Sequence, residues 1–307
     1  MKNIFSFFLL AFGLFWFPYG HAELFEIENL NEQLIGNKDE IIAKYEDTFV
    51  QIARNHNLGF EELLLANPNI DPWLPGEGSS IVLPKQFILP QVDRLGIVIN
   101  LPEYRLYYYY KQDGIDFVAS WPISIGKVNW GTPLLSTFIA GKKKKPSWYP
   151  PDSVRAEHAA EGDILPAVVL PGPDNPLGEF ALRLGLPSYL IHGTNRPAGI
   201  GMRVTHGCIR LFPEDIEWLF NKAALQTPVR IINQPIKFGW SAEGLYIEAH
   251  PMLEDKQSIS PMTLAMQSLI KATDGNQGLS INWDLVEDLV ASPSGLPFQI
   301  GERIKTL

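Results

Sequence analysis

The sequence predicts a mainly β protein: a β-sandwich-like domain, preceded by a small β-α-α-β domain and followed by an α/β C-terminal appendage. From residue 95 onward, short runs rich in Val, Ile, Tyr and Phe alternate with a period of two, as strands do. The joints between these runs are rich in glycine and proline, and the 307-residue chain has 25 of each. Many short strands with such joints indicate a sandwich-like domain.

Residues 1–22 have the features of a secretory signal peptide. A lysine precedes an apolar run from Ile4 to Phe17, and small residues at Gly20 and Ala22 suit cleavage after Ala22. This run is short for a hydrocarbon layer of about 30 Å, so a cleaved signal is favoured over a retained membrane anchor. We therefore expect an exported mature protein with no membrane span.

The charge balance excludes some classes of partner. The formal net charge is −9, which argues against nucleic acid or an anionic membrane as the main partner. The basic run from Lys142 to Lys145 stands out against this balance, and we interpret it as a solvated loop.

Residues 41–86 form a small domain after a polar lead-in at 23–40. Asp47-Thr48 can cap a first helix, and a second helix from Phe60 should end at Asn67-Pro68. The apolar run Ile81–Leu83 predicts a closing strand, and a linker follows from residue 86 to 92.

The larger domain spans residues 95–233. Asp113-Gly114 predicts a hairpin, and Pro213 predicts the first position of a helix whose apolar stripe includes Ile216. The predicted strands are 97–99, 104–110, 117–123, 136–140, 180–184, 189–192 and 229–232. Residues 146–178 form a long proline-rich loop. Its Trp148 and Tyr149 are candidates for a lid that contacts substrate; the alternative is that these aromatic rings only pack the loop against the domain. The C-terminal subdomain, 234–307, should hold a strand at 244–249 and helices at 261–273 and 282–289.

The single cysteine of the chain, Cys208, cannot form an internal disulfide. It is a buried apolar residue, an intermolecular link or a free reactive thiol, and its glycine-flanked, histidine-rich surroundings favour the last. If residues 205–208 are extended, His206 and Cys208 share a face with Cα atoms about 7 Å apart, which is too far for a direct hydrogen bond. His192 ends another strand, and cross-strand neighbours have Cβ atoms about 4.5–5.5 Å apart. We therefore expect His192 to be the general base, with His206 assisting.

Backbone amides complete the expected site. Gly207 permits a tight turn, and the amides of Gly207 and Cys208 can stabilise an oxyanion. A thiol and two imidazoles are also three possible zinc ligands, so a catalytic zinc site is an alternative. We expect no metal and no cofactor.

Two resemblances to known families follow from these residues. Asp47-Thr48-Phe49, Asn67, Leu74-Pro75-Gly76 and Ile81–Pro84 resemble a LysM domain, although Glu46-Asp47 replaces the usual Gly-Asp. The LysM resemblance implies binding to peptidoglycan glycan; the alternative is a subdomain that only packs on its neighbour.

The second resemblance covers residues 95–233. Ile191-His192-Gly193-Thr194, followed by Thr205-His206-Gly207-Cys208-Ile209-Arg210, resembles the signature of the L,D-transpeptidase (YkuD) family. With the LysM-like domain, the chain is similar to the enterobacterial periplasmic members. The resemblance implies Cys208 as nucleophile, His192 as proton acceptor and donor, and His206 as a further active-site residue. We expect Gly193, Thr205 and Arg210 to contact substrate, and Arg203, Arg210 or Lys142–Lys145 to meet its carboxylates.

The family implies a cysteine-dependent acyl transfer on peptidoglycan. Cys208 attacks a stem tetrapeptide at its third residue, D-alanine leaves, and an amine takes the acyl group. A diaminopimelate acceptor gives a 3-3 crosslink, whereas a lipoprotein lysine gives an anchored lipoprotein. Alternatives are a hydrolase of the same fold, in which water is the acceptor, and a non-catalytic peptidoglycan-binding protein.

Overall fold

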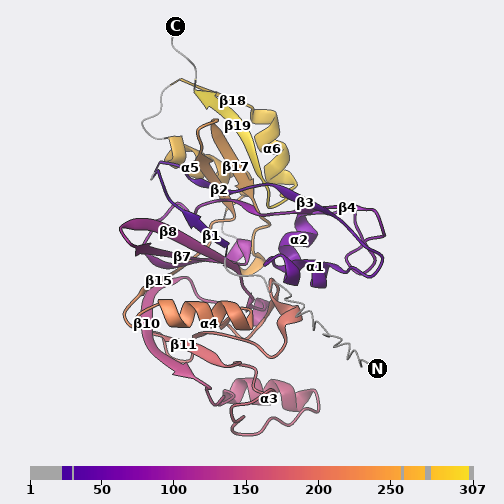
Figure 1. Cartoon of the computed structure of the whole chain (residues 1–307), viewed down its shortest axis with the longest axis vertical. Helices are drawn as coiled ribbons and strands as arrows, with labels where there is room; N and C mark the ends of the chain where they lie inside the picture. Colours follow the sequence, from indigo (N-terminus) through magenta and orange to yellow (C-terminus); the bar gives the residue numbers. More distant parts are fainter. Residues whose placement is uncertain (1–22, 30, 257–258, 274–277, 304–307) are drawn as a thin grey trace, which may run out of the picture.

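The largest element of the structure is a nine-stranded, strongly curved sheet (Figure 1). The computed structural model describes residues 23–29, 31–256, 259–273 and 278–303. In sheet order the strands are β1 (Glu23–Glu26), β8 (Ile115–Pro122), β7 (Arg105–Gln112), β6 (Gly96–Asn100), β15 (Pro228–Ile232), β10 (Leu135–Lys144), β11 (Phe180–Leu184), β12 (Leu190–His192) and β14 (Ile209–Arg210). The mainly β prediction is confirmed, and each strand predicted between residues 95 and 233 is present.

The β7–β8 hairpin illustrates how the sequence specifies this sheet. Asp113 and Gly114 form the turn with φ of 52° and 86°, the left-handed geometry that a two-residue hairpin turn needs. Alternation in β7 places Tyr107 and Tyr109 in one apolar cluster and Tyr108 in another, so the tyrosines lie on both faces as expected.

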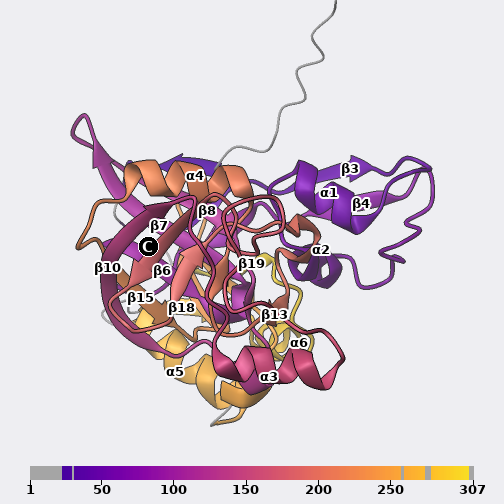
Figure 2. The ribbon, with the colours of Figure 1, turned by 90° about the horizontal axis from the view of Figure 1, so that it is seen from below.

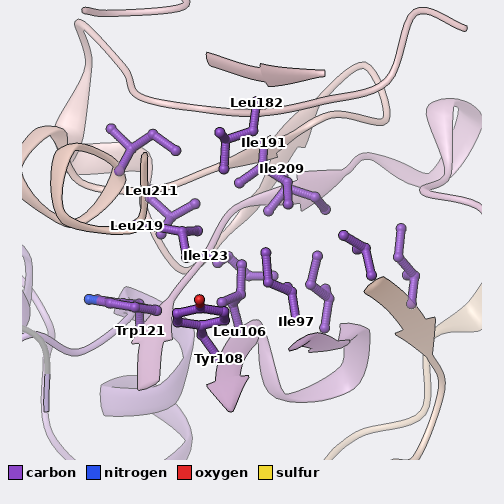
Figure 3. Close-up of a cluster of buried hydrophobic side chains, with 14 of the residues drawn as sticks. Ile97, Leu106, Tyr108, Trp121, Ile123, Leu182, Ile191, Ile209, Leu211 and Leu219 are labelled. Atoms are coloured by element: carbon purple, nitrogen blue, oxygen red, sulfur yellow. The ribbon is translucent and has the colours of Figure 1, made fainter. Parts of the chain in front are cut away.

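The main core lies between the curved sheet and α4 (Pro213–Lys222), shown in Figure 3. Trp121 is fully buried, and its ring centroid is 5.3 Å from that of Trp218 on α4. Ile191 and Ile209, from the adjacent strands β12 and β14, point into the same core. The strands that carry the expected site therefore rest on a buried apolar layer.

The small N-terminal domain has the predicted element order. Its elements are β3 (Asp39–Ile42), α1 (Phe49–Asn55), α2 (Phe60–Ala66) and β4 (Ser80–Leu83). Thr48 caps α1 as predicted, and its hydroxyl accepts from the Gln51 amide at 3.3 Å. We call residues 39–83 the N-terminal unit; they share one apolar cluster.

Two parts of the early chain differ from the prediction. The polar lead-in forms two strands, β1 and β2 (Leu34–Gly36), and the start of β3. The residue patterns of β1 and β2 are weak, and these strands form by backbone pairing with β8 and with β5 (Gln86–Ile88). The expected linker likewise contains β5. The predicted signal peptide lies outside the described residues, and none of the helices described could span a bilayer.

The C-terminal region packs a four-stranded sheet against two helices, at the top of Figure 1. Its elements are β16 (Ile236–Trp240), β17 (Leu245–Ala249), α5 (Pro261–Thr273), β18 (Leu279–Ile281), α6 (Trp283–Ala291) and β19 (Pro297–Arg303). The predicted strand and both helices are confirmed. Three strands, β16, β18 and β19, were not predicted. They carry glycine or polar residues at intervals and pair only within this sheet.

A buried ion network joins this sheet to the nine-stranded one. Lys237, fully buried on β16, forms ion pairs with Glu103 and with Glu248, the latter at 2.8 Å. Burial alone would raise the pKa of Glu248, but the charges of Lys237 and His250 lower it. Glu248 also accepts the Ile88 amide of β5. One ammonium therefore balances two carboxylates from different parts of the chain.

We expect Lys237→Met to lower the free energy of unfolding by about 3–5 kcal/mol, because it leaves the buried carboxylate of Glu103 without a countercharge and that of Glu248 with His250 alone. The measurement is urea unfolding at pH 7. Lys111→Met is the control: its exposed pair with Asp116, at 3.3 Å, is worth about 0–1 kcal/mol. Equal losses in the two variants would contradict the assigned role.

Candidate active site

The parallel pairing of β12 with β14 brings the predicted nucleophile and base to one edge of the sheet. Ile191 pairs with Ile209 and His192 with Arg210. Cys208 immediately precedes β14 and Arg210 lies two residues after it, so alternation puts both on the His192 side. The charge of Arg210 acts on the pKa of both His192 and Cys208, in agreement with this placement.

His192 is buried and its tautomer is determined by the backbone. Its Nδ1 lies 2.7 Å from the Gly193 carbonyl oxygen, which can only accept, so Nδ1 carries the proton. The lone pair is then on Nε2. Burial and the nearby Arg210 charge lower the pKa of His192 to about 3. The ring is therefore neutral near pH 7, with the lone pair of Nε2 free of a proton.

The surroundings of Cys208 favour its neutral thiol form. Burial raises its pKa, and the Leu190 backbone and the Arg210 charge oppose that effect only in part. Its Sγ donates to the Ser188 carbonyl oxygen at 3.5 Å. Among the hydrogen bonds of the described residues, none joins Cys208 to His192. The thiol must therefore turn from Ser188 towards the imidazole before proton transfer.

The segment 205–208 is not extended, contrary to the geometry assumed for His206. Gly207 has a φ of 97°, and a Cβ there would lie 3.0 Å from Tyr189 Cε1. Thr205 Oγ1 donates to the Cys208 carbonyl oxygen at 2.6 Å and accepts the Gly207 amide at 3.2 Å. This turn explains why His206 and Cys208 do not share a strand face.

His206 faces a residue that the sequence analysis did not identify. Its Nε2 donates to Glu157 Oε2 at 2.6 Å, and Lys127 forms an ion pair with the same carboxylate. The edge of Trp130 contacts the imidazole, with ring centroids 5.0 Å apart. Burial lowers the pKa of His206, and the bond to Glu157 opposes that effect. Thr205 and Gly207 thus adjoin Cys208, whereas His206 belongs to a neighbouring polar cluster.

Glu157 was missed because it lies on α3 (Asp152–Ala160), inside the segment taken as a loop. Prolines surround this helix, and its own pattern is too polar to be distinguished from a loop. Trp148 exchanges two backbone hydrogen bonds of 2.8 Å with Val169, and the buried Asn175 amide donates to the Pro146 carbonyl oxygen at 2.8 Å. Trp148 therefore anchors the base of the segment that brings α3 to His206. In Figure 2, α3 lies at the bottom of the molecule and α4 at the top.

The basic candidates for carboxylate binding differ in availability. Arg203 is engaged with Asp255 at 2.9 Å and with the Gly126 carbonyl. Lys142 lies in β10, not in a loop, and donates to the Ala223 carbonyl oxygen at 2.8 Å. Arg210 has a buried Nε without a hydrogen-bond partner among the described residues. Arg210 is thus the available cation beside the thiol.

The described residues give no support to zinc bound by Cys208, His192 and His206. Within the ranges described, one group of acidic, histidine or cysteine side chains lies close enough to share an ion: Glu103, Glu248 and His250. Lys237 pairs with both carboxylates of that group, so a fixed positive charge already occupies the centre.

The depressed pKa of His192 predicts acid sensitivity. An unfolded histidine has a pKa of about 6.5, so the unfolded chain binds more protons below that pH, and stability falls as pH drops toward 3. Between pH 7 and 4.5 this one group should remove about 2–3 kcal/mol. The measurement is urea unfolding across that range for wild type and His192→Gln. Parallel stability curves would contradict the assigned pKa.

Glu157→Gln should lower the pKa of His206 further, because the variant loses the carboxylate that favours the imidazolium. The ring protons of His206 can be followed by NMR during a pH titration. Asp152→Asn is the control, since Asp152 lies on the same helix but pairs with Arg155. If the two variants titrate alike, Glu157 does not control His206.

Comparison with known proteins identifies the family of this chain. Residues 94–231 match the YkuD family, the L,D-transpeptidase catalytic domain. The chain is 38% identical over 291 residues to the probable L,D-transpeptidase YcfS of Escherichia coli K12, covering 91% of this chain and 88% of that protein. It is 40% identical over 258 residues to the probable L,D-transpeptidase YbiS of the same strain, covering 81% of each. A crystal structure of L,D-transpeptidase 3 from Mycobacterium tuberculosis is 18% identical over 52% of this chain and 73% of that one, with a TM-score of 0.33. The chain belongs to the L,D-transpeptidase (YkuD) family.

Proposed function

We propose that this protein transfers acyl groups between peptidoglycan stem peptides, with Cys208 as nucleophile and His192 as general base. The observation that carries the proposal is the hydrogen bond from His192 Nδ1 to the Gly193 carbonyl, which leaves Nε2 unprotonated beside the strand that Cys208 begins. Cysteine nucleophiles need such a base, itself oriented by a third group. Here a backbone carbonyl is the orienting group.

The first step forms a thioester. His192 Nε2 takes the thiol proton, and Cys208 Sγ attacks the carbonyl carbon of the third residue of a tetrapeptide stem, diaminopimelate in this family. The Gly207 amide is engaged by Thr205, so the Cys208 amide is the better placed of the two expected donors to the oxyanion. The imidazolium then gives its proton to the amine of D-alanine, which leaves.

The second step returns the enzyme to its resting state. An acceptor amine attacks the thioester carbon and loses a proton to His192. The C–S bond breaks, and the thiolate recovers that proton from the imidazolium. The net result exchanges one peptide bond for another, and water as acceptor would instead give hydrolysis.

Arg210 suits the role of a carboxylate anchor. Burial lowers the pKa of its guanidinium, although the adjoining Cys208 opposes that effect, and its Nε is unpartnered within the described chain. A substrate carboxylate would satisfy this donor and fix the stem beside the thiol. Gly193, Thr205 and Trp148 would complete the binding site, with Gly193 and Thr205 near the reacting atoms and Trp148 at the base of the α3 segment.

We also propose export to the periplasm and a LysM-like role for residues 41–86, which would bind glycan next to the stem peptides. The packing of the N-terminal unit on the catalytic sheet is compatible with glycan binding and with a purely packing role. The acceptor is a second diaminopimelate or the lysine of a lipoprotein.

The test combines adduct formation with product analysis. A carbapenem should increase the intact mass of the wild type by one acyl group, and Cys208→Ala should show no increase. Purified muropeptides with added diaminopimelate should give 3-3 crosslinked products with the wild type and none with Cys208→Ala. Full activity of Cys208→Ala would overturn the proposal.

The same assay separates the alternatives. Trimmed stems without a crosslinked product, even with excess amine, would identify a hydrolase. Retention on sacculi without adduct or product would identify a non-catalytic binding protein. Activity that survives thiol alkylation and is lost with a chelator would identify zinc catalysis.

A further inference from the structure

We infer that α2 of the N-terminal unit positions Cys208, so that this unit is a structural part of the active site. This inference rests on the proposed role of Cys208 as nucleophile. Its starting point is the loop of residues 197–202, which connects the His192 region to β13 (Arg203–Thr205) and thence to Cys208.

The loop and α2 are joined by backbone contacts. The Phe60 amide donates to the Ile200 carbonyl oxygen and the Glu61 amide to the Gly201 carbonyl oxygen, both at 3.3 Å. These two amides lie in the first turn of α2, where no partner exists within the helix. The loop therefore supplies the acceptors that the start of α2 lacks.

Glycines allow this approach on both sides. Gly201 has a φ of 83°, and a Cβ there would lie 2.3 Å from Gly59 Cα and 2.5 Å from the Phe60 nitrogen. A Cβ on Gly59 would lie 2.9 Å from Gly201 Cα. The next residue, Met202, packs against the apolar cluster of the N-terminal unit. Any larger residue at either glycine must separate the loop from the helix.

The helix is itself rigidly attached to the central sheet. Glu62 pairs through both oxygens with Arg105 of β7, at 2.7 and 2.9 Å, and Arg105 is fully buried. Glu62 also accepts the Gly59 amide at 2.6 Å. The Glu62 carboxylate thus holds both Arg105 of the sheet and Gly59, the glycine that contacts the loop.

From the loop, a short path leads to the nucleophile. The Ile125 amide donates to the Met202 carbonyl oxygen at 3.2 Å, and β13 then pairs with β9 (Ile125–Gly126). β13 ends at Thr205, whose hydroxyl holds the Cys208 carbonyl at 2.6 Å. A shift of Gly201 would therefore move Thr205 and, with it, the backbone of Cys208.

A second contact reaches the other side of the site. Arg54 on α1 pairs with Glu214 on α4, with one Nη–Oε distance of 2.9 Å, and its guanidinium lies 4.3 Å from the centre of the Phe212 ring. Ile216, on the same helix, closes the space beside Gly193. Contacts from the N-terminal unit thus support both strands that meet at the site, β12 and β14.

The experiment uses the full chain and the single cysteine. Alkylation of Cys208 by iodoacetamide is measured from pH 6 to 10 for wild type, Gly201→Ala and Gly59→Ala. We expect slower alkylation or a displaced pH profile, and a fall in the kcat of acyl transfer by about tenfold to a hundredfold, the effect of misplacing reacting groups by about 1 Å. KM for the donor peptide should change much less.

Two variants serve as controls. Gly78→Ala introduces the same left-handed strain, at a φ of 84°, in the same unit but with no heavy atom near the added Cβ. Gly199→Ala alters the same loop, where the Cβ would meet only a Val204 methyl group at 3.5 Å. Both should keep the wild-type profile and kcat.

The outcomes are separable. Gly59 has a φ of −85°, so Gly59→Ala tests the contact without backbone strain if Gly201→Ala does not fold. Folded Gly59→Ala or Gly201→Ala with the wild-type alkylation profile would overturn the inference, as would an equal change in Gly78→Ala. Alkylation needs no peptide substrate, so it tests the positioning role even if the wild type transfers no acyl group.

Discussion

The parallel pairing of β12 with β14 is the constraint on which the site depends. Parallel neighbours need a connection that leaves the sheet and returns, and here it is the sixteen-residue stretch from Gly193 to Cys208 rather than a helix. The pairing is only two residues long, and a slip of one residue would turn the Cys208 side chain away from His192. The register of β12 and β14 is therefore set by contacts outside the sheet, namely the turn at Gly207 and the contacts of the 197–202 loop.

Burial favours the neutral forms of His192 and Cys208, the proposed catalytic pair. The carbonyls of Gly193 and Ser188 each accept one of their protons. Charge would then develop only when Cys208 Sγ attacks the carbonyl carbon of the substrate. Preorganised dipoles in the site would stabilise that charge strongly. The positive charge of Arg210 acts on both groups: it favours the thiolate of Cys208 and disfavours the imidazolium of His192.

Much of the fold could be predicted from the sequence, because strand periodicity, the cap at Thr48 and the helix start at Pro213 are local signals. The catalytic roles of Cys208 and His192 come from their spacing in the motif and stay predictions. Glu157 and Ser188 could not be predicted. Glu157 reaches His206 through a helix with no clear apolar stripe, and Ser188 acts through its carbonyl, which any residue has. The geometry assumed for residues 205–208 was wrong because the φ of Gly207 depends on tertiary contacts with Tyr189 and Thr132.

The protonated state of Cys208 also affects its chemical durability. Peroxide and disulfides react with thiolates, and a sulfur kept as S–H by burial and by the Ser188 carbonyl presents little thiolate to them. Cys208, the proposed nucleophile, is the single cysteine of the chain, so its sulfur cannot be protected as an internal disulfide. A sulfur that stays protonated until the acyl donor binds would resist oxidation. Its reactivity would then depend on the presence of the acyl donor.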